Sequence, residues 1–102
     1  MPYEIEFSTE SLADIKILLS IDRSKVIDAI ETHLLHNLTQ ESKSRIKRLR
    51  EMDKPQYRLR VDEIRIFYDV RENIVEIIAI VPKSQAAQWL LCEGKTTEST
   101  EE

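Results

Sequence analysis

The chain has 102 residues, which fits a single domain, and its 19 acidic against 15 basic residues give a formal net charge of −4. A hydrophobic fraction of 41% is enough for a small core, while the single Gly excludes a glycine-rich phosphate loop. The only cysteine, Cys92, excludes a disulfide framework and a cysteine-based zinc site. We find neither a membrane-spanning apolar run nor a signal-peptide pattern, and therefore expect a cytoplasmic protein.

The first part of the chain predicts a strand followed by two helices. Residues 3–7 alternate apolar and charged side chains, which is typical of a half-buried strand. Ser8 or Thr9 can cap a first helix of about ten residues, and Asp22 can cap a second helix. The apolar stripe of this second helix continues to Leu38, so the two helices are expected to form a helical hairpin.

The second part predicts three strands in a meander and a short helix. A basic, polar stretch at 40–50 is a loop or the start of a short strand, and the strands follow at 56–61, 64–70 and 74–81. The last of them is apolar at nearly every position, which predicts a central strand buried on both faces. Residues 84–91 indicate a short helix that docks back on the sheet through Trp89 or Leu90.

This order of elements predicts an α+β domain with helices packed on one face of a sheet. The domain covers residues 1–92. Residues 93–102 contain four acidic residues, one basic residue and no apolar residue, so we expect a disordered acidic tail.

Basic residues are concentrated in one segment of this acidic chain. Residues 43–60 hold 8 basic and 2 acidic residues, a local charge of +6. Such a segment can bind a polyanion even when the total charge does not favour it. The alternative interpretation is that the charges only solvate an exposed face.

Asp62-Glu63 is a two-residue connection between strands, and it fixes how the flanking residues pair. Arg60 then lies opposite Arg65, with Arg58 on the same face, while the opposite face is apolar and should hold the helices. Like charges that face each other across strands destabilise a sheet by up to about 1 kcal/mol. Either acidic neighbours such as Asp69 or Glu76 neutralise the cluster, or the guanidinium groups form a seat for phosphate.

The sequence resembles the RelE/ParE toxin superfamily over roughly residues 2–91. The resemblance rests on four motifs in this order: Leu49-Arg50, Tyr57-Arg-Leu-Arg-Val61, Ile64-Arg-Ile-Phe-Tyr68, and an apolar strand running into Pro82-Lys83. It implies a RelE-like β-α-α-β-β-β(-α) fold, with two N-terminal helices on one face of a small, mostly antiparallel sheet. It also implies the toxin half of a bacterial type II toxin–antitoxin pair, with a cognate antitoxin as partner.

RelE-like members cut mRNA in the ribosomal A site, so the resemblance implies the ribosome and mRNA as partners, with no cofactor and no metal. Matched by position, the catalytic residues would be Arg58, Arg60, Arg65, Lys83 and Trp89. The RNA-binding residues would be Lys47, Arg48, Arg50 and Lys54. Trp89 stands where the family has a late Tyr, and its indole has no proton to exchange, although it can stack on a base.

The expected reaction is attack of the ribose 2′-OH on the adjacent phosphorus, which cuts the strand and leaves a cyclic phosphate. Arg60 and Arg65 would bind the scissile phosphate, with help from Arg58, and Lys83 is the candidate for proton transfer.

Two other functions stay open. A ParE-like inhibitor of DNA gyrase needs no nuclease residues, and a degenerate toxin would bind only its antitoxin; the missing late Tyr favours either one. His33 and His36 could share a metal, but their spacing fits a solvated helix face better. Cys92 has no catalytic partner pattern and is expected to be inert.

Overall fold

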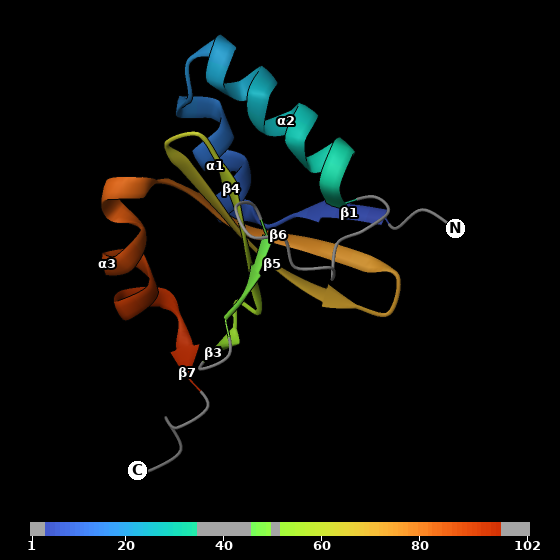
Figure 1. Ribbon diagram of the computed structural model, residues 1–102, viewed down its shortest axis with the longest axis vertical. Coiled ribbons are helices and arrows are strands. Elements are labelled where there is room, and N and C mark those ends of the chain that lie inside the picture. The colour runs from blue at the N-terminus through green and yellow to red at the C-terminus, as the bar shows by residue number, and fades with distance from the viewer. Residues whose placement is uncertain (1–3, 35–45, 50–51, 97–102) are drawn as a thin grey trace.

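The computed structural model describes residues 4–34, 46–49 and 52–96 (Figure 1). In chain order the elements are β1 (Glu4–Phe7), α1 (Thr9–Ile17), α2 (Ser20–Leu34), β2 (Ile46–Arg48), β3 (Met52–Lys54), β4 (Tyr57–Val61), β5 (Ile64–Arg71), β6 (Ile74–Pro82), α3 (Lys83–Glu93) and β7 (Lys95–Thr96). None of the helices in these ranges is long and apolar enough to span a bilayer.

The main sheet has five strands in the order β1-β6-β5-β4-β2, and β3 pairs with β7 in a separate two-stranded sheet. β1 runs parallel to β6, and the other neighbours in the main sheet are antiparallel. The predicted α+β class and the meander of β4, β5 and β6 are therefore confirmed, and β6 is an interior strand, although β5 and not β6 is the middle strand of the sheet.

The helical hairpin begins at a cap that also ties it to the sheet. The Ser8 hydroxyl oxygen accepts the backbone N–H of Ser11 at 3.1 Å and donates to the carbonyl oxygen of Ile78 at 2.8 Å. α2 starts at Ser20, so Asp22 lies in the first turn of the helix and not at the cap, where it was predicted. A carboxylate in the first turn interacts favourably with the helix dipole. The predicted continuation of this helix to Leu38 lies outside the described residues.

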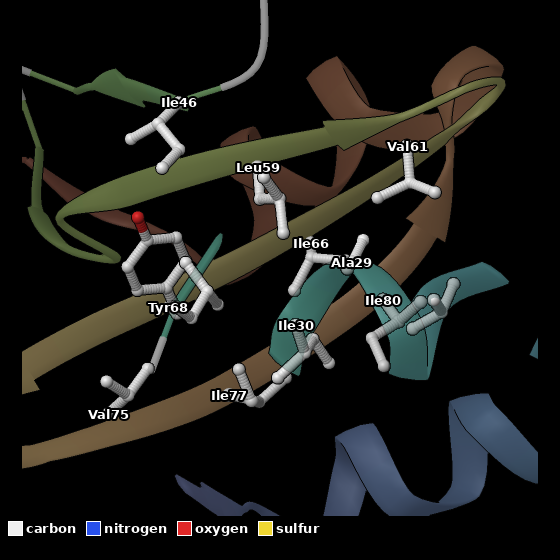
Figure 2. Close-up of a cluster of buried hydrophobic side chains, with 12 residues drawn as sticks. Ala29, Ile30, Ile46, Leu59, Val61, Ile66, Tyr68, Val75, Ile77 and Ile80 are labelled. Carbon is white, nitrogen blue, oxygen red and sulfur yellow. The ribbon is translucent and has the colours of Figure 1, made fainter. Parts of the chain in front are cut away.

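The main core lies between α2 and one face of the sheet. Figure 2 shows side chains from α2, β2, β4, β5 and β6 pointing toward one another; they include Ala29, Ile30, Ile46, Leu59, Ile66, Tyr68 and Ile77. Leu59, Ile66 and Ile77 are fully buried. The apolar face of the predicted hairpin therefore holds the helices, as expected from its alternation.

A second, smaller cluster covers the other face of β5 and β6. Phe67, Ala79 and Val81 pack there against Trp89 and neighbouring residues of α3. β6 is thus buried on both faces, as predicted, and α3 docks through Trp89. α3 lies on the side of the sheet away from α2 (Figure 1).

The structure differs from the sequence prediction at the C-terminus and at β3. Glu93 ends α3, and β7 pairs antiparallel with β3, whereas disorder was expected from residue 93 onward. Backbone pairing with β3 satisfies the polar main chain of β7 although β7 has no apolar residue, so composition alone misled the prediction. Residues 97–102 of the expected tail lie outside the described residues.

Candidate functional site

The predicted register of the β4–β5 hairpin is confirmed. Arg60 pairs with Arg65, and Arg58 pairs with Phe67 across the two strands. On the other side of β4, Lys47 of β2 pairs with Arg58. Paired positions share a face, so three adjacent strands present basic side chains on the face that α2 does not cover. We call Lys47, Arg58, Arg60 and Arg65 the basic face.

Arg58 lies at the middle of the basic face and is only partly accessible to solvent. Its Nε is buried and has no hydrogen-bond partner within the described part of the chain. Burial lowers the pKa of the Arg58 guanidinium, and the charges of Arg65 and Arg60 lower it further. An anion bound at the accessible part of the Arg58 guanidinium would offset the charge repulsion among the three arginines.

Arg65 is buried, with 8% of its surface exposed, whereas an open position was expected. Its Nη1 donates to the carbonyl oxygens of Asp62 at 2.9 Å and Ile64 at 3.1 Å. Arg65 therefore holds the hairpin turn and places a positive charge beneath the surface. Its strand partner Arg60 is exposed and free to meet a ligand.

The acidic neighbours do not neutralise these arginines. Asp69 Oδ2 and Glu76 Oε1 lie 3.7 and 3.8 Å from Lys54 Nζ, and Asp69 Oδ1 accepts the backbone N–H of Gln56 at 2.7 Å. Among the described residues, no carboxylate lies within ion-pair distance of Arg58, Arg60 or Arg65. The structure thus favours a seat for an external anion, and it places Lys54 in internal ion pairs.

The other predicted residues divide between the two faces of the sheet. The Arg48 guanidinium lies 5.1 Å from the centre of the Tyr57 ring, on the face that packs against α2. The backbone N–H of Lys83 donates to Glu63 at 2.7 Å, which brings the start of α3 to the hairpin turn next to Arg60 and Arg65. Arg50 lies outside the described residues.

Trp89 is fixed by two contacts. Its ring stacks on Phe67, with centroids 4.9 Å apart and planes 6° from parallel, and its Nε1 donates to Glu10 Oε2 at 3.0 Å. Trp89 therefore anchors α3 over the strand residue that pairs with Arg58. Sequence reasoning missed both partners. The signal that could have found Phe67 is its pairing with Arg58, which puts an apolar residue on a charged face, whereas no local signal links Glu10 to a residue so distant in the chain.

The remaining metal candidate gains no support from the part of the chain that is described. His36 lies outside it, and no group of three His, Cys, Asp or Glu side chains there is arranged to hold a metal ion.

Several solved toxin–antitoxin complexes contain a chain with a similar fold. The toxin–antitoxin complex RelBE2 from Mycobacterium tuberculosis matches with a TM-score of 0.69 and 19% identity over 80% of this chain and 99% of that chain. The archaeal RelE–RelB complex from Pyrococcus horikoshii matches with a TM-score of 0.68 and 16% identity over 83% of this chain and 99% of that chain. The DinJ–YafQ complex from E. coli matches with a TM-score of 0.64 and 16% identity over 85% of this chain and 97% of that chain.

The sequence itself carries the family assignment. A family model described as the ParE toxin of the type II toxin–antitoxin system parDE matches residues 5–87. A search of curated proteins finds no match. The chain belongs to the RelE/ParE family and is a toxin of a type II toxin–antitoxin system.

Proposed function

We propose that this toxin is a RelE-like, metal-independent endoribonuclease that cuts mRNA on the ribosome and so stops translation in the cytoplasm. The observation that carries the proposal is the basic face. It holds three arginines that no described carboxylate neutralises, and one of them has a buried, unpartnered Nε. Such a cluster suits a phosphate group, whose oxygens accept paired guanidinium N–H groups.

Each basic residue has a separate role in this proposal. The exposed Arg60 and the partly accessible guanidinium of Arg58 bind the scissile phosphate and the charge that develops on it during 2′-OH attack, which leaves a cyclic phosphate. Arg65 stays bonded to the turn, keeps Arg60 in register and adds its field. Lys83, at the start of α3 beside the turn, supplies the proton transfer. Lys47 holds a neighbouring phosphate.

Trp89 acts as an anchor and a stacking surface in this scheme and transfers no proton. Its N–H is engaged by Glu10, and an indole has no titratable proton near neutral pH. Rate acceleration therefore rests on charge stabilisation and positioning by the arginines and on proton transfer by Lys83.

The partner that controls the toxin would be an antitoxin encoded by a neighbouring reading frame. The corner where α1 ends and α2 begins exposes Ile17, Leu19 and Ile21, with 81%, 71% and 64% of their surfaces accessible. An apolar patch of this kind suits an amphipathic segment of a second chain. Co-expression should give a complex whose stability falls in a Leu19→Asp variant; an unchanged complex would place the antitoxin elsewhere.

A second candidate, inhibition of DNA gyrase, is favoured by two observations. The matching family model is that of the ParE toxin, and a Trp stands at the late position where nuclease members have Tyr. A gyrase inhibitor would use the basic face for binding alone.

Induced expression in a bacterial host separates the two functions. The readouts are protein synthesis with mapping of mRNA ends, and gyrase-linked DNA breaks. The proposal expects growth arrest with cut mRNA and intact DNA, lost in Arg60→Gln because an exposed phosphate ligand is removed without disturbing the core.

Arg71→Gln is the matched control. Arg71 is exposed like Arg60, but it lies at the far end of β5, where its Nη2 is 3.9 Å from Glu6 Oε1. It should remain toxic. Stalled gyrase complexes with uncut mRNA would replace the first proposal by the second, and normal growth on wild-type expression would indicate a degenerate toxin.

A further inference from the structure

β6 contains one residue more than the stretch of β5 that it pairs with. Phe67 of β5 pairs with Ala79, whereas the next residue of β5 pairs with Ile77. Ile78 lies between these two partners and is the extra residue, which makes this part of β6 a β-bulge. Because successive residues of a strand point to opposite faces, one extra residue reverses the alternation of all the residues that follow it.

The packing on the two faces of β6 shows this reversal. Ile77 and Ile80 both belong to the main core, and Figure 2 shows them among its side chains, although they are three residues apart and not two or four. Ala79 and Val81 belong to the smaller cluster under α3. In an unbroken strand, Ala79 and Val81 would share the face of Ile77. The bulge therefore turns the end of β6 toward the face that carries the arginines.

The reversal also determines where Lys83 begins α3. Val81 pairs with Arg65, and two residues later the N–H of Lys83 donates to the carbonyl oxygen of Glu63 at 2.7 Å. Without the extra residue, the alternation of Ile77 would continue, and position 83 would fall on the main-core side of the sheet. The proton transfer assigned to Lys83 therefore depends on the bulge.

α1 supplies the groups that hold the bulge. β1 pairs with β6 as far as Ile77, and beyond that point α1 takes its place along the edge of β6. The Ser8 hydroxyl donates to the carbonyl oxygen of Ile78 at 2.8 Å. The Asp14 Oδ2 accepts the backbone N–H of Ile80 at 3.0 Å. A buried backbone group without a partner is unfavourable, so these two side chains stabilise the bulged register.

Asp14 can be replaced with fewer side effects than Ser8. The Ser8 hydroxyl also caps α1 by accepting the N–H of Ser11, so its loss would disturb the start of the helix. Within the described residues, the hydrogen bond to Ile80 is the one that the Asp14 side chain makes. Alanine is the best helix former, so Asp14→Ala removes this bond and leaves α1 folded.

We propose that Asp14 is a positioning residue for the cleavage reaction. By holding the N–H of Ile80, Asp14 keeps the bulge in β6 and so places Lys83 on the side of the arginines. The inference rests on the proposed function, because Lys83 transfers a proton only in that reaction. Asp14 lies on α1 and acts on the reaction only through β6.

Single-turnover cleavage of mRNA on programmed ribosomes tests the proposal. Asp14→Ala should lower the rate at saturating toxin by about tenfold or more, since a general acid or base contributes about 10²–10⁴-fold and part of this is lost. The toxin concentration at half-saturation should change by less than about twofold, because the arginines that bind phosphate stay in place.

The conservative variant Asp14→Asn keeps an oxygen that can accept the N–H of Ile80. It should cut within about twofold of the wild-type rate, because the hydrogen bond and not the charge holds the bulge. A loss in Asp14→Asn as large as that in Asp14→Ala would overturn the proposal.

A double-mutant cycle shows whether Asp14 acts through Lys83. Asp14→Ala should not slow a Lys83→Met toxin any further, because the group that it positions is already absent. Losses that multiply in the double variant would contradict the proposal.

Two control variants separate positioning from a general loss of stability. Asp28→Ala removes an exposed carboxylate of α2 and should cut as the wild type does. Ile30→Val lowers stability in the main core without touching the bulge, and it should cut at nearly the wild-type rate while it is folded. If Ile30→Val slows cleavage as much as Asp14→Ala does, the effect of Asp14 is one of stability and the proposal is wrong.

NMR measures the geometry independently of activity. The amide proton of Ile80 should exchange with solvent at least about tenfold faster in Asp14→Ala, and as slowly as in the wild type in Asp14→Asn. The cross-strand nuclear Overhauser contacts between Phe67 and Ala79, which mark the bulged register, should weaken in Asp14→Ala. Unchanged exchange and unchanged contacts would overturn the proposal.

The results also separate this inference from the proposed function. If the wild type and Asp14→Ala cut mRNA equally, only the positioning role is wrong. If the wild type cuts no mRNA while Asp14→Ala loses the bulged register, the nuclease proposal is wrong, and with it the reaction that Asp14 would serve.

Discussion

Arg58 carries a charge that the fold does little to stabilise. Its Nε is buried without a partner in the described residues, and Arg60 and Arg65 repel it. A protein that retains such a residue keeps an unfavourable interaction that an anionic ligand would relieve. Stability and function should therefore respond in opposite directions when this charge is removed.

We predict that Arg58→Met raises the free energy of unfolding by about 0.5–1 kcal/mol, because the charge repulsion goes while the aliphatic stem remains. Urea denaturation measures this change. Arg60→Met is the control: the side chain is exposed, so stability should change less, while toxicity falls in both variants. Destabilisation by Arg58→Met would show that Arg58 has an internal partner.

Asp69 predicts how stability depends on pH. Burial raises the pKa of the Asp69 carboxyl, although the N–H of Gln56 and the Lys54 ammonium act against this rise, and Glu76 adds to it. The folded state therefore holds the proton to a higher pH than the unfolded chain, whose carboxyl titrates near about 3.9. This contribution to stability is present below that pH and is lost as pH rises through the folded pKa.

The variant Asp69→Asn keeps an oxygen to accept the Gln56 N–H but cannot ionise. Its free energy of unfolding, relative to that of the wild type, should increase as pH rises from about 4 through the raised folded pKa. Urea unfolding of both proteins across pH 4–7 checks this. A difference that stays constant or shrinks with pH would mean that the pKa is not raised.

Side-chain identity predicted which residues share the basic face, but not how each one is used. The pairing of Arg60 with Arg65 followed from a two-residue turn at Asp62-Glu63. The burial of Arg65 did not follow, because it depends on carbonyl oxygens of the turn that a register argument does not place. The pairing of Lys54 with Asp69 and Glu76 likewise needed the three-dimensional course of β3.

At the scale of the elements, both hairpin turns place a non-glycine residue in the left-handed region. Asp62 has φ 52° and Glu72 has φ 53°. Asp tolerates this conformation better than Glu, because its short side chain can bond locally. The turn between β5 and β6 therefore carries avoidable strain.

Replacing Glu72 by Asn should relieve that strain and stabilise the toxin by about 0.5–1 kcal/mol. The thermal unfolding midpoint measures the effect. Glu63→Asn, in the other turn at a residue whose φ is not positive, is the matched control and should change little. Equal shifts in both variants would show that charge, and not backbone conformation, is responsible.

Elements with strong periodicity were predicted, and those without it were not. β4, β5 and β6 alternate or are continuously apolar, and their sheet follows from that pattern. β3 and β7 are three and two residues long and have no such pattern, so only backbone pairing defines them. α3 docks through Trp89 on Phe67, a contact that helical spacing suggested but could not assign to a partner.

For the whole molecule, the distribution of charge matters more than its sum. The net charge is −4, yet Lys47, Arg58 and Arg60 lie on adjacent strands with no described carboxylate paired to them, and Lys83 starts nearby. Binding of a polyanion should therefore be local and moderate in strength. The excess of acidic groups elsewhere opposes non-specific attraction.

Lys47, Arg58, Arg60 and Lys83 allow three or four contacts with RNA phosphates, and this number predicts how RNA binding depends on salt. The logarithm of the association constant should fall against the logarithm of salt concentration with a slope of about −2 to −3. Fluorescence anisotropy with a labelled single-stranded RNA measures this slope. A slope near zero would mean that phosphates do not bind at the basic face, and a slope steeper than about −6 would indicate a larger basic surface.

The central claim is that the toxin cuts mRNA on the ribosome with the residues of its basic face. Cleavage of mRNA by the purified toxin on programmed ribosomes tests this claim most directly. We predict that the wild type produces defined mRNA ends and that Arg71→Gln does the same. Arg60→Gln should be slower by about 10²–10³-fold, the loss expected for one charge-stabilising donor. Intact mRNA with the wild type, or equal cleavage by Arg60→Gln, would contradict the account.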